Sequence, residues 1–131
     1  MLDDNRKSLM HLRLEQAREC LDAAILMLDA EKYKDAANRS YYCIFHAMRA
    51  VLALDGFDSK KHSGIMSEFG RRYIKTQLFP SNSSKLIRSA FDVRNDCDYN
   101  DFYVISKDDV AIQIENAKTF LAAVEAYIKS L

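Results

Sequence analysis

The sequence predicts an all-α fold, arranged as a single antiparallel bundle of about five helices. Helix breakers are scarce, because the 131 residues include only three Gly and one Pro. That is too few for a β-sandwich or barrel, which needs many tight turns. Long segments also place apolar residues at alternating steps of three and four, the period of a helix face that packs into a core. The length fits one domain over residues 1–131.

Composition narrows the functional class. The 19 basic and 19 acidic residues give zero net charge, so the chain as a whole lacks the positive field of many nucleic-acid-binding proteins, while a local basic patch stays compatible. We expect no membrane span and no signal peptide, since no segment has the necessary apolar run. Cys20, Cys43 and Cys97 are odd in number and lack CxxC spacing, which predicts buried, reduced thiols in a cytoplasmic protein.

Two helices are predicted in the first half of the chain, over residues 5–30 and 35–54. The break between them at Glu31 and Lys32 contains no Gly or Pro, so the second helix is expected to fold back directly as an antiparallel neighbour. It ends at Asp55 and Gly56, where Gly can adopt the left-handed conformation that closes a helix. The apolar stripes consist of Leu14, Ala17, Leu21, Ala24 and Leu28 in the first helix, and of Ala37, Tyr41, Ile44, Met48 and Val51 in the second.

A third helix is predicted over residues 63–77, ending before Pro80, which biases the residue before it away from helical angles. It is rich in basic residues. They are Lys60, Lys61, Arg71, Arg72 and Lys75. Such a cluster is either a solvated helix face or a phosphate-binding patch, and the sequence leaves both interpretations open.

A fourth helix follows the N-cap candidates in residues 81–84. Its apolar stripe begins with Ile87 and Phe91 and continues with Arg94 and Asp98. Buried charges are rare unless paired, so these two side chains are expected to meet each other or groups on the second helix. Residues 99–105 are predicted to be irregular. The last helix starts at a capping signal near Ser106 and carries the stripe Val110, Ile114, Ala117, Leu121, Val124, Ile128 and Leu131.

Three stretches together resemble the HEPN domain family, and more closely its prokaryotic branch of short stand-alone proteins. They are DAANRSYYCIFHAMRAVL from Asp35, KKHSGIMSEFG from Lys60 and RNDCDYNDF from Arg94. Each motif is weak by itself, but their order and spacing match the family over nearly the whole chain. The resemblance implies a helical bundle that forms a homodimer, with the fourth-helix motifs of two subunits facing each other across a shared cleft.

The resemblance also implies functions. Many family members are metal-independent ribonucleases, often toxins neutralised by a separately encoded minimal nucleotidyltransferase. Their signature is an Arg followed after four to six residues by a His. Arg94 matches the Arg, but Tyr99, Asn100 and Asp101 stand where the His is expected. The chain has the Asp98-Tyr99 variant of the short branch, which counts against cleavage. In related pairs the partner modifies a tyrosine beside the motif, and Tyr99 is the position most similar to it.

The candidate site combines groups suited to phosphate chemistry. Arg94 can hold two phosphate oxygens, and His46 or His62 could transfer protons in place of the missing signature histidine. These three are the candidate catalytic residues. The candidate nucleotide- or RNA-binding residues are Asn38, Arg39, Tyr42, Lys61, Ser63, Asp98 and Tyr99. No metal-ligand spacing, Walker loop or Rossmann motif is present, so we expect no metal and no cofactor.

Each candidate also has a purely structural interpretation. His46 could be a hydrogen-bonded core histidine, His62 could cap a helix, and Tyr41 and Tyr42 could pack with satisfied hydroxyls. Arg94 and Asp98 could form an ion pair that attaches the fourth helix to the second, through Asn38 or Arg39. Three functions follow: an RNA- or nucleotide-binding protein paired with a nucleotidyltransferase, an active ribonuclease toxin, or a non-catalytic dimeric scaffold. The missing signature histidine favours the first.

Overall fold

The structure, a computed structural model, describes residues 3–131. Within this range the chain forms helices joined by turns and loops, with no strand, which confirms the predicted all-α bundle. In chain order the elements are α1 (Asp4–Asp29), α2 (Tyr33–Leu54), α3 (His62–Phe69), the π-helical turn η1 (Gly70–Ile74), α4 (Ser83–Tyr99) and α5 (Lys107–Lys129).

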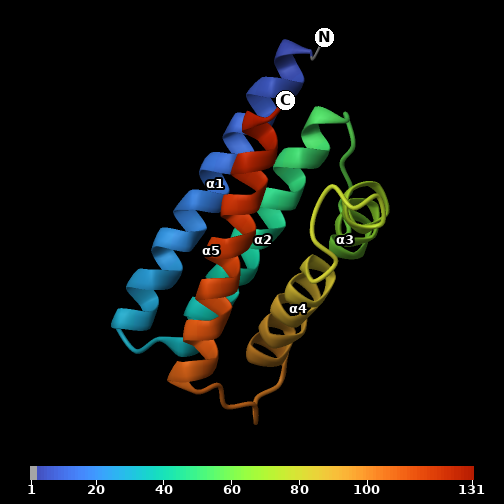
Figure 1. Cartoon of the computed structure of the whole chain (residues 1–131). Helices are drawn as coiled ribbons and strands as arrows, with labels where there is room; N and C mark the ends of the chain where they lie inside the picture. Colours follow the sequence, from blue (N-terminus) through green and yellow to red (C-terminus); the bar gives the residue numbers. More distant parts are fainter. Residues whose placement is uncertain (1–2) are drawn as a thin grey trace.

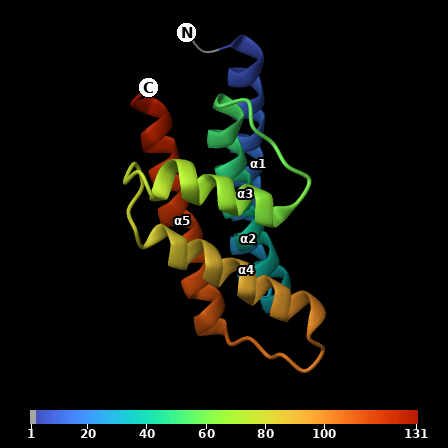
Figure 2. The same ribbon diagram turned by 90° about the vertical axis from the view of Figure 1, so that its right-hand side faces the viewer.

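The long helices α1, α2 and α5 lie side by side, and α3 and α4 pack on the other flank of α2 (Figure 1). Figure 2 shows that α3 runs across the long helices rather than along them. The start of α1 and the end of α5 lie at the same end of the bundle (Figure 1). The helix in the middle is therefore α2, which contacts each of the other four helices.

The turn between α1 and α2 is as short as predicted. Glu31 adopts a left-handed conformation with φ of 61°. The Glu31 amide donates to the Leu28 carbonyl at 3.0 Å and the Lys32 amide to the Met27 carbonyl at 2.8 Å. These two bonds close a helix end in the Schellman pattern, here without the usual glycine. The chain can therefore reverse at once into an antiparallel neighbour.

Burial confirms the predicted core faces. The stripe of α2 is fully buried, from Ala37 at 2% exposure to Tyr41, Ile44, Met48 and Val51 at 0%. From Tyr41 to Val51 it packs with buried residues of α1 and α5 in one apolar cluster, and Ala37 belongs to a second cluster. The predicted stripe of α5 is buried as far as Val124, whereas Leu131 is 63% exposed because the helix ends at Lys129. Leu131 was wrongly predicted as core.

The third helix is shorter than predicted. The α-helical part ends at Phe69, a π-helical turn carries the chain to Ile74, and Gln77 has a left-handed φ of 63°. The predicted extension to Gln77 is therefore wrong. The chain turns early because Phe79 must be buried, at 2% exposure, with its ring 5.1 Å from that of Phe69. Its amide donates to the carbonyl of Tyr73 at 2.8 Å and fixes this reversal.

Of the two predicted helix starts, one is capped by a side chain as expected. The Ser106 hydroxyl accepts a hydrogen bond from the Asp109 amide at 3.1 Å, as a capping residue does. Asn82 precedes α4, but its side chain makes no capping bond. The irregular segment covers residues 100–106, one residue later than the predicted 99–105, because α4 continues to Tyr99.

Two further predictions concern the whole chain. Cys20, Cys43 and Cys97 are buried and form no disulfide, in agreement with the expected free thiols. None of the helices in residues 3–131 is both long enough and apolar enough to span a membrane.

Candidate functional site

One stripe of the central helix is left uncovered. Between Ala36 and Leu54, every side chain of α2 is buried except five that share one face. They are Asn38, Arg39, Tyr42, His46 and Arg49. We call these five residues the polar stripe of α2. A helix that only filled a core would not need polar groups there, so this stripe is the starting point for a functional site.

Arg94 from α4 lies against the polar stripe. It is only 6% exposed, and its guanidinium carbon is 4.7 Å from the centre of the Tyr41 ring and 5.5 Å from that of Tyr42. Its ion pair with Asp98 is long, at 3.7 Å. Its buried Nε has no hydrogen-bond partner among residues 3–131. Aromatic faces stabilise a desolvated cation but accept few of its hydrogen bonds. Arg94 therefore has donor capacity to spare for a ligand.

His62 lies beside Arg94 although 32 positions separate them in the chain. It is the first residue of α3, and its Nδ1 is 2.7 Å from the Tyr41 hydroxyl and 3.2 Å from Nη2 of Arg94. Because a guanidinium can only donate, Nδ1 must accept, so the Tyr41 hydroxyl donates to it as well. The imidazole is then neutral, with its proton on Nε2. Burial, followed by the charges of Arg94 and Arg49, lowers the pKa of His62 in agreement with this state.

Aromatic packing holds this group in place. The His62 ring stacks on Phe45 with 4.3 Å between ring centres. Tyr41 is fully buried, and burial raises the pKa of its hydroxyl to about 12 despite the opposing effect of Arg94. Tyr41 therefore stays protonated and can donate to His62 at any physiological pH. Tyr41 is therefore a packing residue with a satisfied hydroxyl, as its structural interpretation predicts.

A hydrogen-bonded chain connects α4 to α2 next to Arg94. The Asn38 amide nitrogen donates to the Asp98 carboxylate at 3.0 Å, and Arg39 donates to the Asn38 side-chain oxygen at 2.6 and 3.0 Å. Arg94 and Asp98 thus meet each other and the second helix, as predicted. Asp98 differs from the expectation in one respect: its side chain is 27% exposed and not part of the buried stripe. Asp98 lies in the last turn of α4, near the surface, so its carboxylate remains partly hydrated.

His46 occupies the far side of Tyr42, whose ring centre is 6.0 Å from its own. The structure does not show it as a hydrogen-bonded core histidine, because its buried Nδ1 has no partner among the described residues. Burial, then the charges of Arg49 and Arg39, lowers its pKa to about 4. His46 is therefore neutral at pH 7.

The other predicted site residues lie at the margins. Tyr99 is 76% exposed, and its ring centre is 6.0 Å from the guanidinium of Arg94. Lys61 and Ser63 flank His62 at the start of α3 with exposed side chains. His62 does not act as a helix cap, because Lys61 holds that position and no side chain caps α3.

Part of the basic cluster of the third helix is paired. Arg71 contacts Glu68 at 2.8 Å, and Arg72 contacts Glu68 at 2.7 Å and Asp55 at 3.5 Å. Two of its five cations are thus neutralised by acidic neighbours. The two arginines therefore fit the solvated-face interpretation, and the three lysines leave both interpretations open.

Sequence reasoning missed three residues next to the site. Arg13 of α1 is 5% exposed and donates to the Arg49 carbonyl and the Asp58 carboxylate, each at 3.1 Å. Arg49 contacts the same carboxylate at 3.2 Å. The periodicity of the polar stripe could have revealed Arg49, which follows His46 by three positions. Nothing local indicates Arg13 or Asp58, because their contact joins a helix to a distant loop.

The arrangement suits recognition of an anion that also has an aromatic part. Arg39 and Arg94 both face the Tyr42 ring, at 5.0 and 5.5 Å, and two neutral histidines lie beside them. A phosphate offers Arg94 a closer, two-oxygen contact than Asp98 does. Within residues 3–131, no three His, Cys, Asp or Glu side chains are grouped as metal ligands would be.

Comparison with known proteins identifies the family. The HEPN domain family model matches residues 10–127. The chain belongs to the HEPN family. A UPF0332 protein of Thermotoga maritima is 35% identical over 116 residues, which are 88% of this chain and 88% of its own length. A UPF0332 protein of Archaeoglobus fulgidus is 33% identical over 113 residues, 86% of this chain and 89% of its own length.

A third relative has a functional name. This Methanocaldococcus jannaschii protein, provisionally named a toxin, is 28% identical over 117 residues, 89% of this chain and 80% of its own length. The HEPN match extends from within α1 to within α5, so the resemblance drawn from three short motifs is confirmed. The fold places His62 beside Arg94, next to the α4 segment that lacks the family's signature histidine.

Proposed function

We propose that this HEPN protein binds RNA or a nucleotide at the face formed by α2 and α4 around Arg94. The observation that carries the proposal is the state of Arg94. It is a buried cation with a long ion pair, aromatic rings on several sides and an Nε that has no partner in the described part of the chain. It lies against the polar stripe of α2. A bound phosphate satisfies such a group better than its own neighbours do.

Two features favour binding over cleavage. The lone pair of His62 Nδ1 is occupied by Tyr41 and Arg94, so this nitrogen is not free to act as a base. His46 has a pKa of about 4, too low for efficient proton transfer at neutral pH. Both histidines serve better as neutral contacts than as an acid–base pair.

We also propose a toxin-like role in a pair with a minimal nucleotidyltransferase, in the cytoplasm and as a homodimer. The name of the Methanocaldococcus jannaschii relative supports the toxin part. Tyr99 supports the partner part, since a side chain that is 76% exposed is open to modification by another enzyme. Co-purification with the product of a neighbouring nucleotidyltransferase gene tests the pair, and a mass increase on Tyr99 tests the modification.

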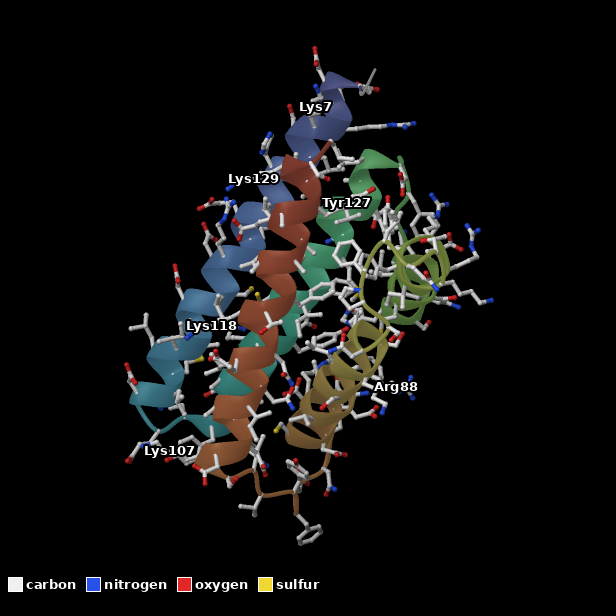
Figure 3. The ribbon with its side chains drawn as sticks, in the orientation of Figure 1. Lys7, Arg88, Lys107, Lys118, Tyr127 and Lys129 are labelled. Carbon is white, nitrogen blue, oxygen red and sulfur yellow. The ribbon has the colours of Figure 1, made fainter. Side chains whose placement is uncertain are left out.

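The binding proposal is tested by titrating the protein with a short 5′-phosphorylated RNA and with single nucleotides. Arg94→Ala should weaken binding at least tenfold. Arg88→Ala is the matched control. Arg88 lies on the same helix, pairs with Asp92 in the same i, i+4 arrangement at 3.3 Å, and is 68% exposed; it extends away from the bundle (Figure 3). If both variants bind alike, Arg94 is structural and the scaffold interpretation holds.

The second candidate is a metal-independent ribonuclease, and one observation favours it. The fold brings a histidine within 3.2 Å of Arg94 even though the signature position lacks one. RNA cleavage measured in excess EDTA decides between the two. Cleavage that disappears in both Arg94→Ala and His62→Ala would establish the enzyme, whereas intact RNA with Arg94-dependent binding supports the binding function.

A further inference from the structure

A second hollow opens next to the Arg94 face, between α1 and α2. It has a volume of about 300 Å³ and is lined by Gln16, Glu19, Cys20, Ala23, Arg39 and His46. Arg39 belongs to both regions, because its guanidinium lies 5.0 Å from the Tyr42 ring centre, as that of Arg94 lies 5.5 Å from it. The hollow and Arg94 are therefore separated by little more than one phenol ring. A single ligand can reach both.

The hollow offers donors and acceptors from opposite walls. On the α2 side, Arg39 has no carboxylate within ion-pair distance among residues 3–131. Its Nη1 reaches only the sulfur of Cys20, a weak acceptor, at 3.8 Å. On the α1 side, Glu19 presents an exposed carboxylate and Gln16 a half-buried amide. Glu19 and Arg39 both act on the Cys20 thiol, raising and lowering its pKa respectively, while burial raises it most.

We propose that this hollow is a nucleobase subsite for the ligand whose phosphate meets Arg94, and that it favours guanine. The inference rests on the proposed binding function. Guanine presents two adjacent N–H groups on its Watson–Crick edge, which match one carboxylate, and two acceptors, O6 and N7, which match a guanidinium. Glu19 takes the first role and Arg39 the second. A volume of about 300 Å³ is at the small end for ligand pockets, which suits one base rather than a large cofactor.

Other bases satisfy the two walls less well. Adenine offers Glu19 only its N6 amino group, and uracil offers a single N–H between two carbonyl oxygens that face the carboxylate unfavourably. The pocket thus distinguishes bases by the number of N–H groups that Glu19 can accept. Gln16 and the His46 ring complete the walls without deciding between bases.

The test uses the full chain and three ligands: GMP, UMP and ribose 5-phosphate. The wild-type protein should bind GMP about tenfold more tightly than either of the other two, the effect of one good bidentate contact. Glu19→Gln keeps the size of the side chain but replaces one acceptor with a donor. It should remove the preference for GMP and leave the affinity for ribose 5-phosphate unchanged. Glu15→Gln, one turn earlier on α1 and outside the hollow, is the matched control and should bind like the wild type.

The outcomes distinguish a failure of this subsite from a failure of the proposed phosphate binding at Arg94. Equal affinity for GMP, UMP and ribose 5-phosphate, still lost in Arg94→Ala, would overturn the base subsite and leave phosphate binding standing. No Arg94-dependent binding of any ligand would overturn both. A second pair of probes tells whether the ligand is a free nucleotide or a guanosine within RNA. These probes are RNA pentamers with one central guanosine or one central uridine. A guanosine preference that is larger in the pentamers than between GMP and UMP, and that Glu19→Gln removes in both, supports the subsite and assigns it to RNA.

Discussion

Arg13 and Arg94 are two buried arginines with opposite surroundings. Their exposed fractions are nearly the same, at 5% and 6%. Arg13 donates to the Arg49 carbonyl and to Asp58, each at 3.1 Å. Within residues 3–131, Arg94 has a carboxylate only at 3.7 Å and a buried Nε without a partner, and it is surrounded by aromatic rings.

The difference shows how a structural arginine can be told from a ligand-binding one. Burial alone does not distinguish them, because both guanidinium groups are removed from water. The number and quality of their acceptors does. Arg13 joins α1, α2 and the loop after α2 through acceptors already in place, so it stabilises the fold. Arg94 retains unsatisfied donors beside an uncovered polar stripe, so it is available to a ligand.

The sharpest way to break this comparison is to remove Arg13. Arg13→Met should lower the free energy of unfolding by about 2 to 3 kcal/mol, because the Arg49 carbonyl loses its side-chain donor and Asp58 keeps only Arg49 and the Ser59 amide as partners. The measurement is urea unfolding followed by circular dichroism at pH 7.5. A loss of less than about 0.5 kcal/mol, the size expected of a surface change, would show that Arg13 is not structural. Ligand affinity, measured where the variant is folded, should stay unchanged.

Removing Arg94 should have the opposite effect, a large loss of ligand affinity with a small loss of stability. Arg94→Met should weaken phosphate-ligand binding about thirtyfold, equivalent to about 2 kcal/mol. Its unfolding free energy should fall by less than about 1 kcal/mol, because His62 retains Tyr41 and Asp98 retains Asn38 as partners. Calorimetric titration and urea unfolding of the same preparation give both values. A large stability loss with unchanged affinity would show that Arg94, like Arg13, is a structural arginine.

The polar stripe itself predicts a pH dependence. The pKa of His46 is lowered in the folded state from 6.5 to about 4, so protonation favours the unfolded chain. The contribution of His46 to the free energy of unfolding is fully present above pH 6.5 and is lost as the pH falls toward 4. The loss should be about 1 to 2 kcal/mol once its partial exposure is allowed for.

This dependence is measured by urea unfolding of the wild type and His46→Gln at pH 7.5 and pH 4.5. The variant should lose less stability than the wild type between the two values, since its side chain does not titrate. Acidic groups contribute equally to both proteins, so the difference isolates His46. Identical losses would mean that His46 is protonated without cost, and thus well solvated.

The smallest effect concerns Asp98, which competes with a ligand for Arg94. Asp98→Asn keeps an acceptor for Asn38 but removes the negative charge 3.7 Å from the guanidinium. Affinity for a phosphate ligand should rise about threefold, and the unfolding free energy should change by less than about 0.5 kcal/mol. Weaker binding in this variant would instead make Asp98 a positioning residue for Arg94.

Most of the fold could be predicted from the sequence because helices are local. The stripes in α1, α2 and α5 recur with the helical period, and the Ser106 cap acts within one turn. The wrong predictions occurred where distant contacts decided the outcome. The end of α3 depends on burying Phe79, and Leu131 lies past the last turn that other helices cover.

The site was predicted in part for the same reason. Arg94 and Asp98 stood out as charges on an apolar stripe, and Asn38 and His46 as polar groups on a core helix. Their partners could not be read from local spacing. The contact of His62 with Arg94, the ion pair of Arg13 with Asp58, and the hollow between Glu19 and Arg39 each join segments far apart in the chain.

By itself, the sequence determined that the protein is a helical bundle with an arginine on the apolar stripe of α4. Hydrophobic periodicity is enough for that, since it depends on residues within a few turns of each other. Only the tertiary structure decided which buried arginine is saturated and which has donors to spare. That distinction depends on hydrogen-bond partners within about 3 Å, and only the packed chain brings them together.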